Sequence, residues 1–376
     1  MFATNVKGDS MLRVVHCGTG NVGRFAVRGL VDRPDLKLVG LYSVSPDKIG
    51  KDAGELVGCD PTGVTATDDL GALLDLKPDC VSYFAMGHNR IAEATDDVVK
   101  ILERGIDVVA TSHVELVAGV HSREDAGPIY ERVAAACETG KSTFFVNGVH
   151  PGFASDALPL LLASVCSRID AIRIQEIAVY DHYIEADGDL TNRKLFGLGM
   201  PPDFQPLMFF PGDGVKLYFG PMIRQIANQL GHPVDDFTIT HENWVTPKDL
   251  NTSMGLIKAG EVAAIHWELH GMVNGVPRVT IEHYTRVQED TAPDWPKLPP
   301  ADNANEDRFR VIVTGEPTAS LIFDAGAENF GRNREEGGHV VAAARTINAI
   351  PAVVAAAPGI LTPPDLPFYA CTNLPW

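Results

Sequence analysis

The fold is decided by the stretch Leu12-Arg-Val-Val-His-Cys17, followed at once by Gly18-Thr-Gly-Asn-Val-Gly23 and then by Arg24-Phe-Ala-Val-Arg-Gly-Leu30. The first run predicts a buried strand, the second is a G-x-G-x-x-G loop, and the third has the apolar spacing of a helix. In such a unit the first glycine permits a tight turn, the second lets a pyrophosphate approach the backbone, and the third lets the helix pack closely on the strand. The positive end of the helix dipole then faces the anion. The alternative is a glycine turn without a ligand.

The context of this loop favours a dinucleotide, because apolar runs and helical patterns alternate from it to about residue 150. Strands are expected at Leu12–Cys17, Leu36–Ser43, Cys80–Ala85, Ile106–Thr111 and Thr143–Val146. Two of the helices between them are expected at Ile91–Arg104 and Arg123–Glu138. Short, valine-rich strands separated by helices predict an α/β domain of Rossmann type, with a doubly wound parallel sheet covered on both faces.

The pattern changes after Pro151. A helix at about 153–167 leads into segments of alternating polarity, which predict strands at Ile172–Tyr180, Glu261–Val273, Arg278–Val287, Phe309–Thr314 and Ala319–Asp324. These segments predict an α+β domain with a mainly antiparallel sheet, one face of which packs on helices while the other is free to meet a ligand or a second subunit.

We therefore expect a dinucleotide-binding domain at 11–150 and a substrate-binding and dimerisation domain at 151–337. A C-terminal segment of about 338–376, helical from 338 to 360, is expected to complete the first domain. The proline-rich stretch 291–305 is expected to be a surface loop.

The overall charge excludes several partners. The chain of 376 residues has 31 basic and 49 acidic side chains, so its formal net charge is −18, which argues against binding to nucleic acid or to anionic membranes. No apolar run is long enough to span a bilayer, and no secretory signal is visible, so we expect a cytoplasmic protein. Its 6 cysteines form no C-x-x-C pair and have no histidine nearby at ligand spacing. We therefore expect reduced thiols and no metal site.

The residues that select the nucleotide are expected about 20 positions beyond the loop, where an acidic side chain would accept the hydroxyls of the adenosine ribose. The sequence there is Tyr42-Ser-Val-Ser45, without a carboxylate. Arg24, Ser43, Ser45 and Lys48 could instead surround a 2′-phosphate, which favours NADP and leaves NAD possible. The alternative is that these are solvated surface residues.

Polar side chains also follow later strands, where ligands of open α/β sheets bind. After the third strand, Met86 and Gly87 are expected near the nicotinamide, whereas His88 and Asn89 could equally cap the next helix. Glu115 stands just beyond the fourth strand among apolar neighbours. A carboxylate placed in this way must be solvated, paired or functional, and burial would raise its pKa.

A third landmark is Phe145-Val-Asn-Gly-Val-His-Pro-Gly-Phe153, which joins the two expected domains. Asn147, His150 and Phe153 are expected to face the cleft, although the segment could also be a purely mechanical hinge. The expected cofactor contacts are then Gly18, Thr19, Gly20, Asn21, Val22, Gly23, Arg24, Ser43, Ser45, Met86, Gly87, His113 and Asn147.

Four segments together resemble a known family. They are Gly18-Thr-Gly-Asn-Val-Gly23, Thr111-Ser-His-Val-Glu115, Asn147-Gly-Val-His-Pro-Gly-Phe153 and Ala357-Pro-Gly-Ile360. They resemble the dihydrodipicolinate-reductase-like dehydrogenases, most closely the 2,4-diaminopentanoate dehydrogenases and the native NAD(P)H-dependent amine dehydrogenases. The resemblance implies a two-domain homodimer in which Glu115 handles the amine. It also implies reductive amination of a ketone or aldehyde with ammonia, and the reverse oxidative deamination.

The chemistry implied by this resemblance needs a group that binds ammonia, moves protons and stabilises an iminium cation, and a partly buried carboxylate at Glu115 would meet all three needs. Phe153, Tyr180 and His182 are expected to line the substrate pocket, although Phe153 and Tyr180 could be ordinary core residues. Two alternatives stay open. One is a reductase of another C=O or C=N bond, and the other is a nucleotide-binding regulator without turnover.

Overall fold

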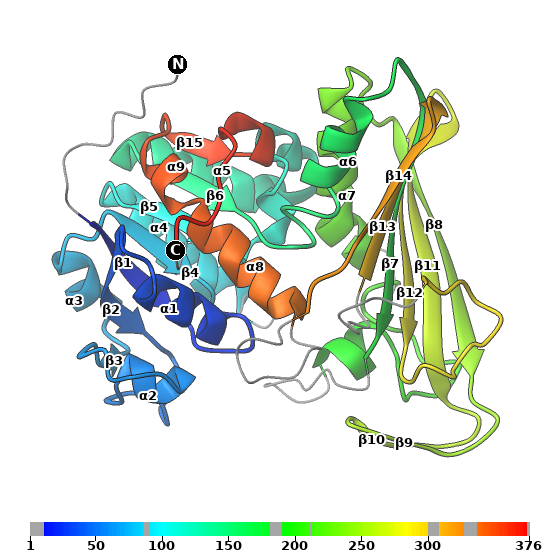
Figure 1. Ribbon diagram of the computed structural model, residues 1–376, viewed down its shortest axis with the longest axis horizontal. Helices are drawn as coiled ribbons and strands as arrows, with labels where there is room; N and C mark the ends of the chain where they lie inside the picture. The colour runs from blue at the N-terminus through cyan, green and yellow to red at the C-terminus, as the bar shows by residue number, and fades with distance from the viewer. Residues whose placement is uncertain are drawn as a thin grey trace. The chain divides into compact units, whose positions relative to one another are not determined.

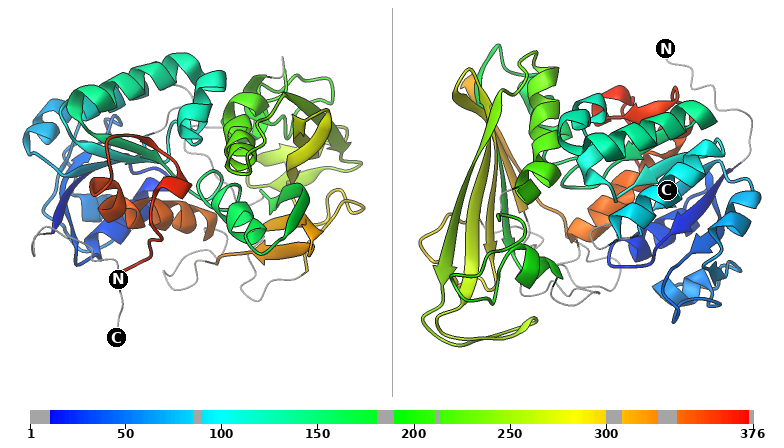
Figure 2. Two further views of the ribbon diagram at one scale, coloured as in Figure 1. Left: turned by 90° about the horizontal axis from the view of Figure 1, so that it is seen from above. Right: turned by 180° about the vertical axis from the view of Figure 1, so that it is seen from behind.

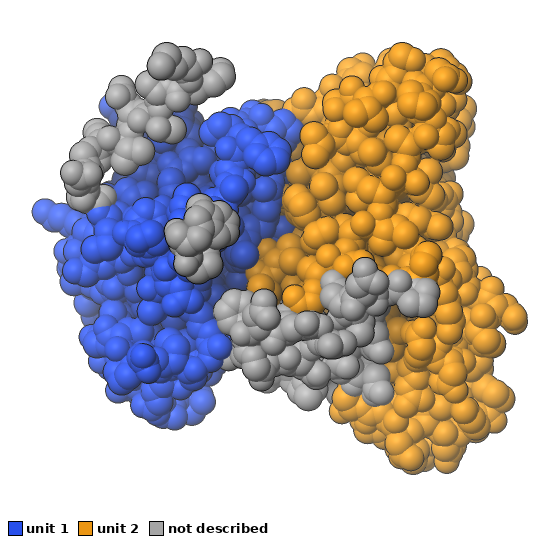
Figure 3. Space-filling model, in the orientation of Figure 1, with its two compact units in different colours: residues 1–113, 128–148, 342–376 blue, residues 114–127, 149–341 orange. Residues whose placement is uncertain are grey.

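The computed structural model, drawn in Figure 1, describes residues 11–85, 90–180, 190–210, 213–299, 308–326 and 337–373. The chain divides into two compact units, shown in Figure 3. Unit 1 comprises residues 1–113, 128–148 and 342–376, and unit 2 comprises residues 114–127 and 149–341. Neither unit is therefore one continuous piece of chain. The domain boundaries expected at residues 150 and 337 stay a prediction.

Unit 1 is built on a seven-stranded sheet with the order β15-β6-β5-β4-β1-β2-β3. Its strands are β1 (Leu12–Cys17), β2 (Leu36–Tyr42), β3 (Ala66–Thr67), β4 (Cys80–Tyr83), β5 (Asp107–Ala110), β6 (Thr143–Val146) and β15 (Gly359–Leu361). Each neighbouring pair is parallel. The central strands consist of fully buried side chains such as Val14, Val15, Val81 and Val108. The prediction of a doubly wound parallel sheet is confirmed.

Helices cover both faces of this sheet, as Figure 2 shows. They are α1 (Gly23–Val31), α2 (Ala53–Val57), α3 (Leu70–Asp75), α4 (Ile91–Glu103), α5 (Arg123–Gly140), α8 (Gly337–Asn348) and α9 (Ile350–Val354). The C-terminal segment differs from the single helix expected over 338–360. A separate short helix, α9, starts at Ile350 with Pro351 in its first turn, where the missing N–H of proline is tolerated. Gly359–Leu361 is then an edge strand that pairs with β6.

Unit 2 contains a six-stranded sheet with the order β14-β13-β7-β12-β11-β8. Its strands are β7 (Arg168–Val179), β8 (Asp236–Val245), β11 (Val262–Val273), β12 (Val276–Arg286), β13 (Arg308–Glu316) and β14 (Ala319–Phe323), and β9 (Leu250–Thr252) and β10 (Gly255–Ile257) form a separate hairpin. Only β7 and β12 pair in parallel among the described strands of the larger sheet. The prediction of a mainly antiparallel second sheet is therefore confirmed.

One face of this sheet packs on α6 (Ala157–Ala163) and α7 (Asp213–Gln229), and we call it the inner face. A single row of residues crosses five strands there: Phe309, Glu176, His283, Trp267 and His241 are neighbours in register on β13, β7, β12, β11 and β8. Three members of the row are polar, although the rest of this face is mostly apolar. The row is therefore a place where a ligand could be bound.

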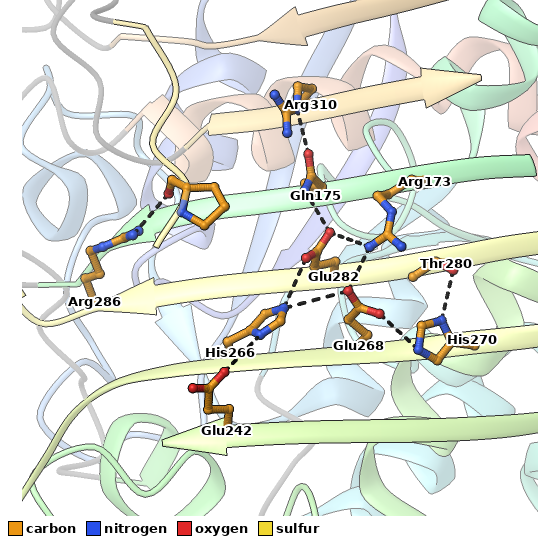
Figure 4. Close-up of polar contacts among 11 residues, drawn as sticks. Arg173, Gln175, Glu242, His266, Glu268, His270, Thr280, Glu282, Arg286 and Arg310 are labelled. Carbon is orange, nitrogen blue, oxygen red and sulfur yellow. Dashed lines mark hydrogen bonds and ion pairs between the residues drawn. The ribbon is translucent and has the colours of Figure 1, made fainter. Parts of the chain in front are cut away.

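The opposite, outer face carries a network of charges, shown in Figure 4. Nη1 of Arg173 donates hydrogen bonds to Glu268, at 2.8 Å, and to Glu282, at 2.6 Å, while Nε2 of His266 lies 3.0 Å from the other oxygen of Glu282. Burial raises the pKa of Glu282, but hydrogen bonds from His266, Tyr284 and Arg173 outweigh it and hold that pKa well below the ordinary value. Both carboxylates thus already share one cation of the protein, Arg173.

One local expectation is wrong. The helix expected at 153–167 begins only at Ala157, because Asp156 accepts hydrogen bonds from the backbone N–H groups of Gly152 and Ala157 and so fixes a turn before it. The stretch 291–299 has no helix or strand and is mostly exposed, as expected of a surface loop, but it is also anchored to the sheet. The guanidinium of Arg286 donates to the carbonyl oxygens of Thr291, at 3.0 Å, and Pro296, at 3.0 Å, and so ties the stretch to the end of β12.

Within the described ranges, the helices are too short or too polar for any of them to cross a lipid bilayer.

Candidate active site

The glycine loop has the geometry that its sequence predicts. Gly18 has φ +92°, and a Cβ there would lie 2.9 Å from the backbone of Phe84 and Ala85. A Cβ on Gly23 would lie 2.1 Å from the carbonyl oxygen of Gly18. A Cβ on Gly20, by contrast, would meet nothing within 4 Å. Gly18 and Gly23 are therefore required by the fold itself, whereas Gly20 leaves its backbone open to a ligand.

The loop is held from behind by a histidine that the sequence analysis did not single out. His16 is fully buried, with Nε2 2.6 Å from the carbonyl oxygen of Gly18 and Nδ1 2.7 Å from Oγ of Ser82. Burial lowers the pKa of His16 to about 4, so the ring is neutral at pH 7. Because a carbonyl can only accept, Nε2–H donates to Gly18 and the hydroxyl of Ser82 donates to Nδ1. His16 is thus a positioning residue for the loop.

Two of the residues expected to select the nucleotide are bonded to the same loop. Nζ of Lys48 donates to the carbonyl oxygen of Thr19 at 3.2 Å, and Nε of Arg24 donates to that of Asn21 at 3.3 Å. Ser43 is buried, and its Oγ accepts a hydrogen bond from the backbone N–H of Ser45 at 3.2 Å. Two cations and two serines therefore lie within unit 1 where β2 ends and α1 begins. Met86 and Gly87 lie outside the described residues.

Asn147 and His113 are buried at the ends of neighbouring strands of unit 1. Nδ2 of Asn147 donates to the carbonyl oxygen of Arg345, at 3.0 Å, and to the hydroxyl of Tyr369, at 2.7 Å, while Oδ1 has no partner in the described chain. Nε2 of His113 lies 3.0 Å from Oγ1 of Thr95, and burial lowers its pKa to about 4. Asn147 thus keeps an acceptor for a ligand, whereas His113 is tied to α4.

Glu115 lies in unit 2, on the short 3-10 helix η1 (Val114–Leu116), which packs against α7. Its side chain is 2% exposed, and Oε1 has no hydrogen-bond partner in the described part of the chain. Burial raises the pKa of Glu115 to about 7. Burial, and in addition the charge of Glu115, raise the pKa of Tyr218 on α7. A buried carboxylate with an unsatisfied oxygen and a pKa near neutrality is a strong candidate for a group that handles protons.

The described residues do not place Phe153, Tyr180 or His182 in a substrate pocket. Phe153 packs edge-on against Phe323, with ring centroids 5.2 Å apart, as a core residue would. Tyr180 is partly buried, and its backbone N–H donates to Arg286. His182 lies outside the described residues.

The structure instead brings together a polar cluster on the inner face of the second sheet. His150 follows β6 in sequence, yet its Nε2 lies 3.3 Å from Nε2 of His283 on β12. Nε2 of His283 is in turn 3.5 Å from Oε2 of Glu176 on β7. Of the three, sequence reasoning had singled out only His150, because nothing in the sequence shows that these strands are neighbours.

A glycine loop on a doubly wound parallel sheet and a buried, unsatisfied carboxylate in the second unit define the class: a two-unit, nucleotide-dependent oxidoreductase. Comparisons with known proteins narrow this class. The chain is 37% identical over 360 residues to the amine dehydrogenase of Streptomyces virginiae, which covers 95% of this chain and 96% of that protein. It therefore belongs to the amine dehydrogenase family, oxidoreductases that act on amine donors with a nicotinamide cofactor.

Two more distant similarities agree with this assignment. Residues 214–373 match the family model of the 2,4-diaminopentanoate dehydrogenase C-terminal domain. The 2,4-diaminopentanoate dehydrogenase of Acetoanaerobium sticklandii is 23% identical over 279 residues, which is 73% of this chain and 70% of that protein. The family resemblance predicted from the sequence is confirmed.

The fold also has a solved counterpart. The amine dehydrogenase structure from Mycobacterium smegmatis superimposes with a TM-score of 0.75 at 20% identity, covering 97% of this chain and 98% of that one.

Proposed function

We propose that this amine dehydrogenase reductively aminates a ketone or aldehyde with ammonia, and catalyses the reverse deamination, with NADPH as its preferred hydride donor. Glu115 is the residue that handles the amine. The observation that carries the proposal is the burial of Glu115 with Oε1 unpartnered. A cation that reaches such a carboxylate is held far more strongly than it would be in water, because the surrounding dielectric constant is low.

The proton inventory explains why one carboxylate is sufficient. When ammonia attacks the carbonyl carbon, the new C–N bond leaves a positive nitrogen and a negative oxygen. Glu115 carries a proton from this nitrogen to the oxygen, which becomes the hydroxyl of a neutral carbinolamine. Glu115 then takes up a proton from solvent and donates it to this hydroxyl, which leaves as water while the C=N bond of the iminium cation forms. A pKa of about 7 suits both directions of this transfer near neutral pH. The bound nicotinamide supplies the hydride that reduces the iminium carbon.

The fit of the cofactor is supported by groups within unit 1. Gly20 leaves backbone open beside the helix N-terminus of α1, where a pyrophosphate binds in folds of this kind. Oδ1 of Asn147 offers an acceptor at the end of β6. Lys48 and Arg24, both bonded to the loop, supply positive charge for a 2′-phosphate and favour NADP over NAD.

The variant Glu115→Gln tests the role of Glu115. It keeps the size of the side chain but can neither ionise nor carry a proton. We expect kcat/KM for reductive amination to fall at least about 100-fold, while the Kd for NADPH changes less than about twofold. The matched control is Glu103→Gln, at an exposed carboxylate of α4, which should leave both constants unchanged. Retained amination in the Glu115 variant would refute the assignment.

A substrate panel separates this function from the alternatives. NADPH oxidation by simple ketones and aldehydes should require ammonium. Turnover of a carbonyl without ammonium would identify a carbonyl reductase. Tight nucleotide binding without turnover of any carbonyl would identify a regulator.

The choice of nucleotide is tested with Lys48→Gln and Arg24→Gln. Each variant should raise the Kd for NADPH about tenfold and leave the Kd for NADH nearly unchanged, since only NADPH carries the 2′-phosphate. An equal effect on both nucleotides would mean that these cations only shape the loop.

The homodimer implied by the family resemblance is likewise part of the proposal. Light scattering on a size-exclusion column should give a mass near twice the 40.5 kDa of one chain.

A further inference from the structure

The cluster of His150, Glu176 and His283 is built from three separate elements of unit 2. His283 and Glu176 are register partners on the parallel strands β12 and β7, so both side chains leave the sheet on its inner face. His150 comes from the segment that precedes α6. One ligand-type atom from each residue lies within 4.8 Å of the other two.

In both rings Nε2 is the nitrogen that faces the cluster, and aromatic neighbours hold the ring planes. Nδ1 of His150 and Nδ1 of His283 are buried and have no hydrogen-bond partner in the described part of the chain, whereas the two Nε2 atoms face each other. His283 stacks on Trp267 with ring centroids 4.1 Å apart, and His150 stacks on Phe309 at 5.6 Å. Phe219 of α7 packs against both imidazoles, at 5.2 Å from each. These aromatic contacts restrain the planes of both imidazoles, in which the two Nε2 atoms converge.

The spacing of the atoms matches a metal site. A tetrahedral ion with bonds of about 2.0–2.1 Å to nitrogen or oxygen has ligands about 3.3–3.4 Å apart along each edge. Two of the three edges are 3.3 Å, from Nε2 of His150 to Nε2 of His283, and 3.5 Å, from Nε2 of His283 to Oε2 of Glu176, and the third is no longer than 4.8 Å. The set of two imidazoles and one carboxylate suits a divalent transition metal.

The second group of similar composition on the same sheet provides a contrast. His266, Glu268 and Glu282 also lie within ligand distance of one another, on the outer face. There, however, the guanidinium of Arg173 already bonds to both carboxylates, as Figure 4 shows. A cation is therefore built into that group by the protein, and a metal ion would have to displace it.

We propose that Nε2 of His150, Nε2 of His283 and a carboxylate oxygen of Glu176 bind one divalent transition-metal ion of the zinc type. Three protein ligands leave the fourth position of such an ion exchangeable, unlike a closed structural site with four ligands. The inference does not depend on the amine chemistry proposed above. From the sequence we expected no metal site, because no potential ligands stand close together along the chain. His150, Glu176 and His283 are far apart in the sequence, and only the folded sheet brings them together.

The first test measures metal content. The full chain is equilibrated with zinc, dialysed, and analysed by inductively coupled plasma mass spectrometry. We expect about one zinc ion per chain in the wild type, and near-complete loss in His283→Phe, which preserves the ring stack on Trp267. The matched control, His266→Phe, removes a histidine from the other group and should keep the full zinc content. Wild type without zinc, or a His283→Phe variant that retains it, would overturn the proposal.

A second readout keeps the test valid if His283→Phe does not fold. Glu176→Gln is nearly isosteric and should weaken zinc binding at least about tenfold, with an unchanged circular dichroism spectrum. Cobalt(II) bound to the wild type should show the visible absorption of a site with few ligands, and Glu176→Gln should change that spectrum. An unchanged cobalt spectrum would mean that Glu176 is not a ligand.

Discussion

Glu115 is nearly fully buried, yet nothing in the described chain bonds to Oε1. The apolar residues around it in the sequence predicted an unusual environment, but they could not show its depth. That depth arises because α7, far along the chain, packs against η1. The sequence thus identified the residue, and tertiary packing set its pKa.

The pH dependence of the reaction should report this carboxyl directly. Burial raises the pKa of Glu115 to about 7, and its ionised form is the one that binds a cation. At constant free ammonia, kcat/KM should therefore fall about tenfold per pH unit below that pKa. Rate measurements from pH 5 to 9 check this, with Glu115→Gln as the reference. A profile that is flat from pH 5 to 8 in the wild type would show that Glu115 does not titrate in this range.

The same burial should cost stability at alkaline pH. The folded-state pKa is raised from 4.5 to about 7, so the folded state binds more protons than the unfolded chain between these values, and stability falls as the pH rises through them. The full cost above pH 7 is about 3 kcal/mol. The variant Glu115→Gln avoids this cost because its side chain does not ionise. The melting temperature of the variant minus that of the wild type should therefore be larger at pH 8.5 than at pH 5. An equal difference at both pH values would contradict the assigned burial.

At the scale of elements, the three loop glycines should respond differently to one added methyl group. Gly23→Ala and Gly18→Ala collide with backbone and should lower the melting temperature as well as abolish NADPH binding. Gly20→Ala has free space in the folded chain, so it should fold normally but weaken NADPH binding at least about tenfold.

Gly29→Ala is the control for this series, since it also meets nothing within 4 Å and lies within α1, away from the loop. It should raise stability by about 0.5–1 kcal/mol and leave binding unchanged. Thermal melts with and without NADPH distinguish these cases. Normal NADPH affinity in Gly20→Ala would contradict the close approach of the pyrophosphate.

Five strands of unit 1 were predicted to within two residues at each end, and β1 and β6 coincide with the runs Leu12–Cys17 and Thr143–Val146. Such strands are buried on both faces, so they are continuous apolar runs that stand out in the sequence. The short edge strands β3 and β15 were not predicted. The helix α7 was missed because Gly214, Gly220 and Pro221 interrupt its apolar pattern. Its helical conformation is stabilised by packing on the inner face, which local propensity does not reveal.

At the scale of the whole molecule, unit 1 depends on residues from both ends of the chain. Ile347, Ile350 and Val353 of α8 and α9 are buried, and β15 completes the sheet. Removal of residues 338–376 should therefore prevent stable folding of unit 1, because each lost core side chain contributes about 1.5–3 kcal/mol against a total of only 5–15 kcal/mol. Circular dichroism and NADPH binding of the truncated chain check this. Normal NADPH affinity would show that unit 1 does not need residues 338–376.

No sequence pattern predicted that residues 114–127 would group with unit 2 or that His150 would meet His283. Both result from contacts between segments that are far apart in the chain. A local sequence pattern shows which face of a strand or helix is apolar, but it does not show which other segment packs there.

The edge strand β15 also bears on how the protein is made. Domains generally fold as units during synthesis, N-terminal parts first. Here the strand that covers the edge of β6 is at Gly359–Leu361, far later in the chain than β6 itself. The edge of β6 therefore stays unpaired until Gly359–Leu361 has been synthesised, and such an edge is a template for pairing with other chains. Chaperone demand during expression should thus be greatest between the synthesis of β6 and that of β15.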